Sequence, residues 1–255
     1  MELYYILCLF VFGTIFGSFF NVVGSRLARN ESIIYPGSHC TYCKHKLGVR
    51  ELIPILSYFI QGGKCKWCHK KLSFYYPLSE FLTGICFSLC YIVFGFTWQF
   101  IIGIVFISFL IMIVSSDIED MIIPDELLII GSVIIILLQI PAYGFQYMIS
   151  HLLQGMCAFF FMWILKIFGD HLFHKESMGG GDIKLLFFFG LVLGFPLAVL
   201  SIFVGSVIGL PISVAFQLKN SHIVPFGPYL CIGAISLLFL NIPFDQLLDM
   251  MVWMP

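Results

Sequence analysis

Residues 98–126 read WQFIIGIVFISFLIMIVSSDIEDMIIPDE. The first nineteen residues of this stretch carry no charge, and a helix that crosses a lipid bilayer needs about 20 largely apolar residues. The next ten contain five acids, starting with Asp117, and no base. The stretch therefore predicts a membrane span that ends in a cluster of carboxylates.

Long uncharged apolar stretches like residues 98–116 recur along the rest of the chain. Of 255 residues, 60% are hydrophobic and 11% are charged, whereas about a quarter are charged in soluble domains. We expect an all-α membrane protein with about eight transmembrane helices. The predicted spans are Leu3–Val23, Leu78–Gly95, Trp98–Ser116, Leu127–Tyr143, Met148–Phe168, Ile183–Leu193, Pro196–Phe216 and Tyr229–Ile242.

Positive charge predicts the orientation, because Lys and Arg accumulate in cytoplasmic loops. With eight spans, all thirteen Lys and Arg residues fall on one side, nine of them in the loop after the first span. This places the N-terminus outside and the acid cluster at the cytoplasmic face. Ile183–Leu193 is short for a span, and the topology after it would invert if it did not cross.

The long loop between the first two spans contains a duplication. Cys40-Thr-Tyr-Cys43-Lys-His-Lys-Leu47 is echoed 25 residues later by Cys65-Lys-Trp-Cys68-His-Lys-Lys-Leu72. Two Cys-x-x-Cys pairs of this kind supply four thiolates to a structural Zn²⁺ ion. The alternatives are a membrane dithiol oxidoreductase and reduced cysteines without metal. The chain is thereby divided into a first helix (1–25), a cytoplasmic zinc-knuckle loop domain (26–76) and a polytopic unit (77–255).

A second acidic position follows a run of glycines, Gly179-Gly-Gly181-Asp182, at the start of the sixth span and on the same side as Asp117. Glycine permits positive φ and lets a substrate backbone approach closely. A helix N-cap is the plain alternative for Asp182, and it is the role we expect for Asp125. Glu119, Asp120 and Glu126 are interpreted as solvated loop charges.

Two apposed carboxyl groups are suited to peptide hydrolysis, because one can take a proton from water while the other donates one to the carbonyl oxygen. We therefore predict an aspartyl peptidase that uses Asp117 and Asp182. The main alternative is a membrane transporter or metal-binding protein with the same acids as ion ligands, which would place them near the middle of the bilayer.

Several motifs, taken in order, resemble those of the type IV prepilin peptidases, including the competence-type enzymes, which are Gly-x-Gly-Asp membrane aspartyl proteases. The resemblance covers nearly the whole chain. Besides both cysteine pairs, it rests on Gly17-Ser-Phe-Phe-Asn21, Leu52-Ile-Pro54-Ile-Leu-Ser57-Tyr, Tyr76-Pro77-Leu-Ser-Glu80, Asp117 with Pro124, Gly179-Gly-Gly-Asp182-Ile-Lys184 and Pro225-Phe-Gly-Pro228.

The resemblance implies cleavage of prepilin-like precursors after glycine at the cytoplasmic face of the bacterial inner membrane. It assigns catalysis to Asp117 and Asp182, with Gly179, Gly181, Pro124 and Lys184 supporting the catalytic loop. It also implies, for many members, methylation of the new amino terminus with S-adenosylmethionine. The acids Glu119, Asp120 and Glu126 are a candidate receptor for the basic leader. Partners are the precursor and the lipid bilayer, and no nucleic acid is expected.

Overall fold

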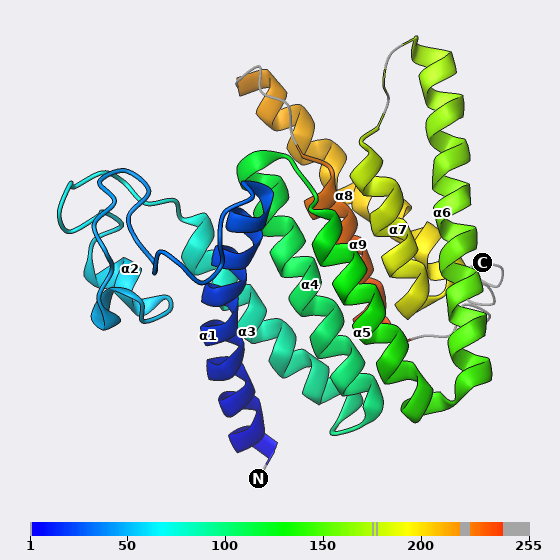
Figure 1. Cartoon of the computed structure of the whole chain (residues 1–255), viewed down its shortest axis with the longest axis horizontal. Helices are drawn as coiled ribbons and strands as arrows, with labels where there is room; N and C mark the ends of the chain where they lie inside the picture. The colour runs from blue at the N-terminus through cyan, green and yellow to red at the C-terminus, as the bar shows by residue number, and fades with distance from the viewer. Residues whose placement is uncertain (1, 175, 177, 220–224, 242–255) are drawn as a thin grey trace, which may run out of the picture.

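The chain folds as a bundle of long helices with a loop domain attached to one side (Figure 1). The computed structural model describes residues 2–174, 176, 178–219 and 225–241. Within them the elements are α1 Glu2–Ala28, η1 Val49–Glu51, α2 Leu56–Ile60, α3 Tyr75–Phe94, α4 Trp98–Asp120, α5 Asp125–Tyr143, α6 Phe145–Phe173, α7 Gly180–Leu193, α8 Phe195–Lys219 and α9 Gly227–Leu240. The described residues form no sheet, only two isolated bridges in the loop domain.

Helix α4 is the centre of the bundle and contacts α1, α3, α5 and α9. It is the most buried of the long apolar helices, with 67% of its most apolar stretch inside the protein. The ring of Phe106 lies 5.2 Å from that of Phe188 and 6.0 Å from that of Phe189. All three side chains are fully buried, so aromatic packing ties α4 to α7 in the core.

Helices α1 and α3 approach each other closely through glycine. A Cβ atom on Gly13 would lie 2.8 Å from the Cα of Gly84, closer than real Cβ atoms come. Small residues allow such contacts between membrane helices. Gly17 lies in the same seam, against Thr83 and Glu80.

Six of these helices are long and apolar enough to cross a membrane by length and composition. α7 and α9 have 14 residues each, which at 1.5 Å per residue is about 21 Å, less than the roughly 30 Å of a hydrocarbon core. With the six long helices, α7 and α9 account for the eight apolar helices that the sequence predicts. Ile242 and Lys175 lie outside the described residues.

The helix ends alternate between the two ends of the bundle, as predicted. A cavity of about 460 Å³ is lined by residues from the ends of α3, α5, α7 and α9 and from the starts of α4, α6 and α8. The C-terminal end of α7 therefore lies at the same end of the bundle as the ends of α3, α5 and α9. The acid cluster, the glycine run and the cysteine loop belong to the opposite end (Figure 1).

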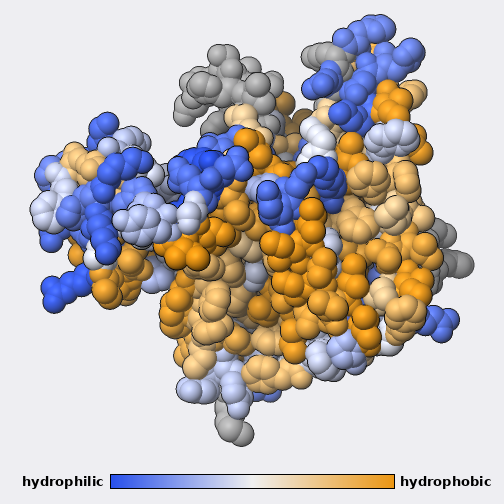
Figure 2. All heavy atoms as spheres, viewed as in Figure 1, coloured by the Kyte–Doolittle hydropathy of each residue, from blue (hydrophilic) through white to orange (hydrophobic). Residues whose placement is uncertain are grey.

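The outer surface of the bundle is apolar. Exposed large side chains include Val11 on α1, Val133 on α5 and Trp163 on α6. Figure 2 shows a broad hydrophobic band over the helices, with hydrophilic residues gathered on the loop domain and at the upper end of the bundle. The chain is a multi-pass membrane protein, since only lipid suits so much exposed apolar surface.

The seam between α1 and α3 gives a stability prediction. A Cβ on Gly84 would lie 2.9 Å from the backbone oxygen of Phe10, and backbone cannot move aside cheaply. Gly84→Ala should therefore destabilise the protein by about 1–3 kcal/mol, seen as a lower melting temperature in detergent. Gly180→Ala is the matched control, because a Cβ there meets nothing within 4 Å; equal melting of the two variants would contradict the packing argument.

Candidate active site

Asp117 lies in the last turn of α4 and is buried, with 7% of its surface exposed. The helix was predicted to end at Ser116 but continues to Asp120, and Met121 closes it in the left-handed conformation with φ of 54°. The N–H of Met121 donates to the carbonyl oxygen of Asp117 at 3.0 Å. Asp117 is therefore held by regular helix rather than by a loop.

Asp182 is the third residue of α7 and is half-buried. The N-cap position is occupied by Gly179, so the alternative interpretation of Asp182 as an N-cap was wrong. The expected positive φ was also wrong: Gly179 has φ of −68°, and Gly181 is not among the positive-φ glycines. A Cβ on Gly181 would instead meet the side chain of Ile123 at 2.9 Å, so this glycine allows close packing of the loop before α5.

The two aspartates lie near each other around Ile123, which packs against Gly181, the residue before Asp182, and against Gly227, which contacts Asp117 Oδ2. Their carboxyl groups are within electrostatic range of each other. The two residues are 65 positions apart in the sequence (182 minus 117). They come from different helices and lie at the same end of the bundle. Neither is near mid-span: one is in a last turn and the other in a first turn. This position disfavours an ion pathway through the middle of the bilayer.

Helix α9 completes the surroundings of the pair. The backbone N–H of Gly227 donates a hydrogen bond to the Asp117 carboxylate, and a Cβ on Gly227 would lie 2.5 Å from Asp117 Oδ2. Cys231, one turn further on, is fully buried and within electrostatic range of both aspartates. The Pro225–Pro228 motif is visible in the sequence, but it carries no local signal that Gly227 contacts Asp117.

Glu119 and Asp120 are not solvated loop charges, which corrects the sequence interpretation of these two acids. Glu119 and Asp120 are helical, and both pair with Arg29 at 3.0 Å. Tyr76 donates a further hydrogen bond to Glu119 at 2.8 Å. This network joins the ends of α1 and α4 to the start of α3.

The loop between α4 and α5 has a different arrangement from the one expected. Pro124 is buried and occupies the N-cap position of α5, so Asp125 is the first helical residue and not the cap. Asp125 pairs with Lys184 of α7 at 2.7 Å, with both side chains about half exposed. Glu126 is exposed and makes no ion pair within the described part of the chain.

The four predicted cysteines converge. The sulfur atoms of Cys40, Cys43, Cys65 and Cys68 all lie within 4.8 Å of one another. Two of the separations, Cys40 to Cys68 and Cys43 to Cys65, are 3.9 Å. Tetrahedral ligation with metal–sulfur bonds of about 2.3 Å requires sulfurs about 3.8 Å apart. The cluster therefore has the dimensions of a four-thiolate metal site.

The duplication in the sequence is also a duplication in space. The N–H of Cys40 donates to the oxygen of His45, and the N–H of Cys65 donates to that of Lys70, both at 2.9 Å. Lys44 and His69, at equivalent positions, both have φ of 57°. The aromatic residue of each knuckle packs across the pair, Tyr42 under Lys70 and Trp67 against His45.

Without a bound metal ion, the thiols of the cluster differ in their pKa values. Hydrogen bonds from the backbone N–H groups of Cys68 and Trp67 lower the pKa of the Cys65 thiol to about 7. Although the backbone of His45 lowers it, desolvation and hydrogen bonds with the other thiols raise the pKa of Cys43 to about 11. Four thiolates this close would repel one another unless a metal ion neutralised them.

The fold and site define a polytopic membrane protein with two acids from separate helices at one end of its bundle and a four-cysteine cluster beside them. Residues 11–94 match the bacterial peptidase A24 N-terminal domain and residues 104–214 match the type IV leader peptidase family. A relative from Bacillus subtilis (strain 168), named prepilin leader peptidase/N-methyltransferase, is 34% identical over 89% of this chain and 91% of its own length.

Proteins of the same name from Neisseria gonorrhoeae and Pseudomonas aeruginosa are each 29% identical, over 88% and 92% of this chain and 86% and 90% of their own lengths. No solved structure matches. The chain belongs to the type IV leader peptidase family, which confirms the resemblance seen in the sequence.

Metal content tests the cysteine cluster directly. Elemental analysis of the purified protein should find about one metal ion per chain, and Cys40→Ser should lose it and melt at a lower temperature, because the loop domain has little core of its own. Cys157→Ser is the control, since Cys157 is exposed on α6. Equal metal content in wild type and Cys40→Ser would contradict the assignment.

Proposed function

We propose that this protein is a membrane aspartyl endopeptidase that removes the basic leader of prepilin-like precursors at the cytoplasmic membrane face, with Asp117 and Asp182 as the catalytic pair. The observation that carries the proposal is the meeting of these two acids at the polar end of an otherwise apolar bundle. The names of the relatives supply the substrate class.

The chemistry follows from two carboxyl groups that cannot both ionise comfortably. One is a carboxylate that takes a proton from water as the water oxygen attacks the scissile carbonyl. The other is protonated and donates its proton to the carbonyl oxygen. When the tetrahedral intermediate collapses, the carboxyl group that took the water proton gives it to the leaving amine, and the other carboxylate takes back a proton from a hydroxyl group of the intermediate. The backbone N–H of Gly227 stabilises Asp117 when that carboxyl group is ionised, as a pre-organised donor.

The position of the pair suits a substrate anchored in the membrane. A precursor whose apolar helix lies in the bilayer would present its leader at the end of that helix. Asp117 and Asp182 lie at the corresponding level of the bundle, in a last and a first helical turn. Basic residues, most of them in the cysteine loop, lie at the same end of the bundle as Asp117 and Asp182. They favour a position of this end on the cytoplasmic side of the inner membrane.

We infer that the metal of the cysteine cluster is Zn²⁺ and that its role is structural. Four thiolates leave no open coordination position for catalysis and are the ligand set of structural zinc. The loop domain contains only η1 and the five-residue α2, with no buried residue in either, so it depends on the metal for its fold.

The catalytic pair is tested by co-expressing the protein with a prepilin-like precursor. Wild type should shorten the precursor, as seen on a gel and by mass spectrometry of the product. Asp117→Asn and Asp182→Asn should each leave it intact, with rate losses of at least about 10³-fold, because members of an acid–base pair act as a unit.

The matched control is Asp170→Asn on α6, which should cleave like wild type. Melting temperatures of all variants should agree, so that a loss of cleavage reports chemistry. Normal cleavage by either dyad variant would overturn the assignment of the catalytic pair.

We propose that Glu126, rather than all three acids Glu119, Asp120 and Glu126, recognises the basic leader. Glu119 and Asp120 already pair with Arg29, so their reversal would also break the network around Tyr76. Glu126 is the cleaner probe. Glu126→Lys should raise KM for a precursor with a basic leader, and more so at low salt, where exposed charges are least screened.

A precursor with a neutral leader is the control and should show no such difference. An equal rise in KM for both precursors, or one that does not depend on salt, would argue against electrostatic recognition by Glu126.

A further inference from the structure

The connection between α4 and α5 lies beside the catalytic pair. It consists of residues 121–124, with Met121 closing α4 at φ of 54° and Pro124 as the N-cap of α5. Ile122 is 49% exposed, whereas Ile123 is half-buried and packs against the core. The Ile123 side chain therefore faces the protein, on the side of the two acids.

The Ile123 side chain lies against two glycines that adjoin the acids. A Cβ atom on Gly181, the residue before Asp182, would lie 2.9 Å from Ile123 Cβ and 3.1 Å from Ile123 Cδ1. A Cβ atom on Gly227 would lie 3.5 Å from the same Cδ1 and 2.5 Å from Asp117 Oδ2. A single carbon atom at that point would touch both the Ile123 methyl group and the Asp117 carboxylate, so little space separates them.

Ile123 has little freedom to leave this position. The residue before a proline is restricted to extended backbone, and a β-branched side chain is stiff at χ1. Pro124 follows Ile123 and is buried. Asp125, next along the chain, pairs with Lys184 of α7 at 2.7 Å, which ties this connection to the helix that carries Asp182. The methyl groups of Ile123 therefore form a fixed wall that a substrate has to accommodate.

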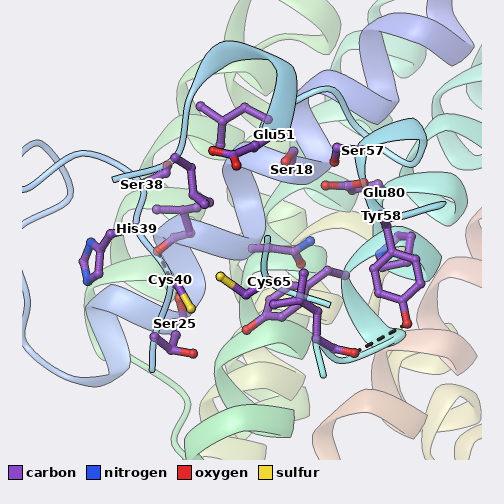
Figure 3. Close-up of a pocket in the computed structure, with 18 of the residues that line it drawn as sticks. Ser18, Ser25, Ser38, His39, Cys40, Glu51, Ser57, Tyr58, Cys65 and Glu80 are labelled. Carbon is purple, nitrogen blue, oxygen red and sulfur yellow. Dashed lines mark hydrogen bonds between the residues drawn. The ribbon is translucent and has the colours of Figure 1, made fainter. Parts of the chain in front are cut away.

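The cavity beside the cysteine loop is separate from this wall. It has a volume of about 310 Å³ and lies between the loop and the helices α1 and α3. Figure 3 shows Ser18, Ser57 and Glu80 gathered at one side of it, with Cys40 and Cys65 at another. Of the described residues that line it, none belongs to α4, α7 or α9, the helices around the catalytic pair. A substrate side chain next to the acids therefore does not enter this cavity.

The scissile peptide bond has to lie between the two carboxyl groups, with its carbonyl carbon within reach of the attacking water. The side chain of the residue that supplies this carbonyl begins two covalent bonds from the carbon under attack. If that residue is glycine, the substrate backbone can pass beside Ile123 without a side chain in the way. A Cβ atom on the substrate needs space that Ile123 already fills, and close-packed side chains yield such space only at a cost.

We propose that Ile123 is a specificity-determining residue, which restricts the substrate residue that supplies the scissile carbonyl to glycine by filling the space beside the pair. The inference rests on the proposed function and gives a physical origin to the cleavage after glycine that the family resemblance implies. A difference of one methylene group in an apolar pocket changes kcat/KM by about 10- to 200-fold. One fixed side chain is therefore sufficient for a marked preference.

Two precursors that differ only in this residue, glycine or alanine, test the proposal with the full-length protein in nanodiscs. The measured quantity is the ratio of kcat/KM for the alanine precursor to kcat/KM for the glycine precursor. Wild type should favour glycine at least about tenfold. Ile123→Ala removes the Cδ1 methyl group that faces both glycines and should raise the ratio at least about tenfold.

Two further variants control for damage to the fold. Ile122→Ala makes the same change on the exposed neighbour and should keep the wild-type ratio. Ile123→Val keeps the β-branch and loses only the Cδ1 carbon, so it should raise the ratio by a smaller factor than Ile123→Ala. Because the ratio compares two precursors on one enzyme, a general loss of activity does not change it. Ile123→Val decides the question if Ile123→Ala does not fold.

The outcomes separate this proposal from the peptidase one. If wild type cleaves the glycine precursor but the ratio is the same in wild type, Ile123→Ala and Ile123→Val, the specificity role is overturned and the catalytic pair is untouched. Equal cleavage of both precursors by wild type, or an equal rise of the ratio in Ile122→Ala, has the same meaning. If wild type cleaves neither precursor, the proposed function itself is overturned, and the role of Ile123 with it.

Discussion

The arrangement depends on holding two acidic side chains of like charge close together at the edge of an apolar bundle. Left free, Asp117 and Asp182 would separate into water, because their interaction is repulsive. What fixes them is the packing of the helices that carry them: Phe106 of α4 lies against Phe188 and Phe189 of α7. These contacts lie eleven residues before Asp117 and six or seven after Asp182. A close-packed core at that distance leaves the helix ends little freedom to move apart.

The polar end of the bundle has a second support that does not depend on apolar packing. Arg29 at the end of α1 pairs with Glu119 and Asp120, and Tyr76 at the start of α3 donates to Glu119. Exposed ion pairs contribute little individually, but Glu119 is mostly buried and shared by two partners. The main role of this network is therefore to fix positions rather than to add stability. It keeps the helical turn that carries Asp117 aligned with α1, with α3 and with the cysteine loop between them.

Much of this was predictable from the sequence, and what was not has a physical reason. The eight long helices follow from apolar length, and the four-thiol cluster from its duplicated spacing, because both are local patterns. The end of α4 was placed four residues early, since a run of acids opposes a helix C-terminus unless a base neutralises it; Arg29, ninety residues away, does so. The contact of Gly227 with Asp117 and the pairing of Asp125 with Lys184 are likewise tertiary and leave no local signal. The glycines before Asp182 were expected to adopt positive φ, which they do not. Gly181 instead allows close packing against Ile123.

The catalytic pair and the cavity beside the cysteine loop lie at the same end of the bundle yet are supported differently. Asp117 and Asp182 are held by aromatic and glycine-mediated packing inside the bundle, which needs no metal. The cavity has Cys40 and Cys65 in its wall, so its shape depends on the loop domain and on the ion that folds it. Loss of metal should therefore reach the cavity before it reaches the pair.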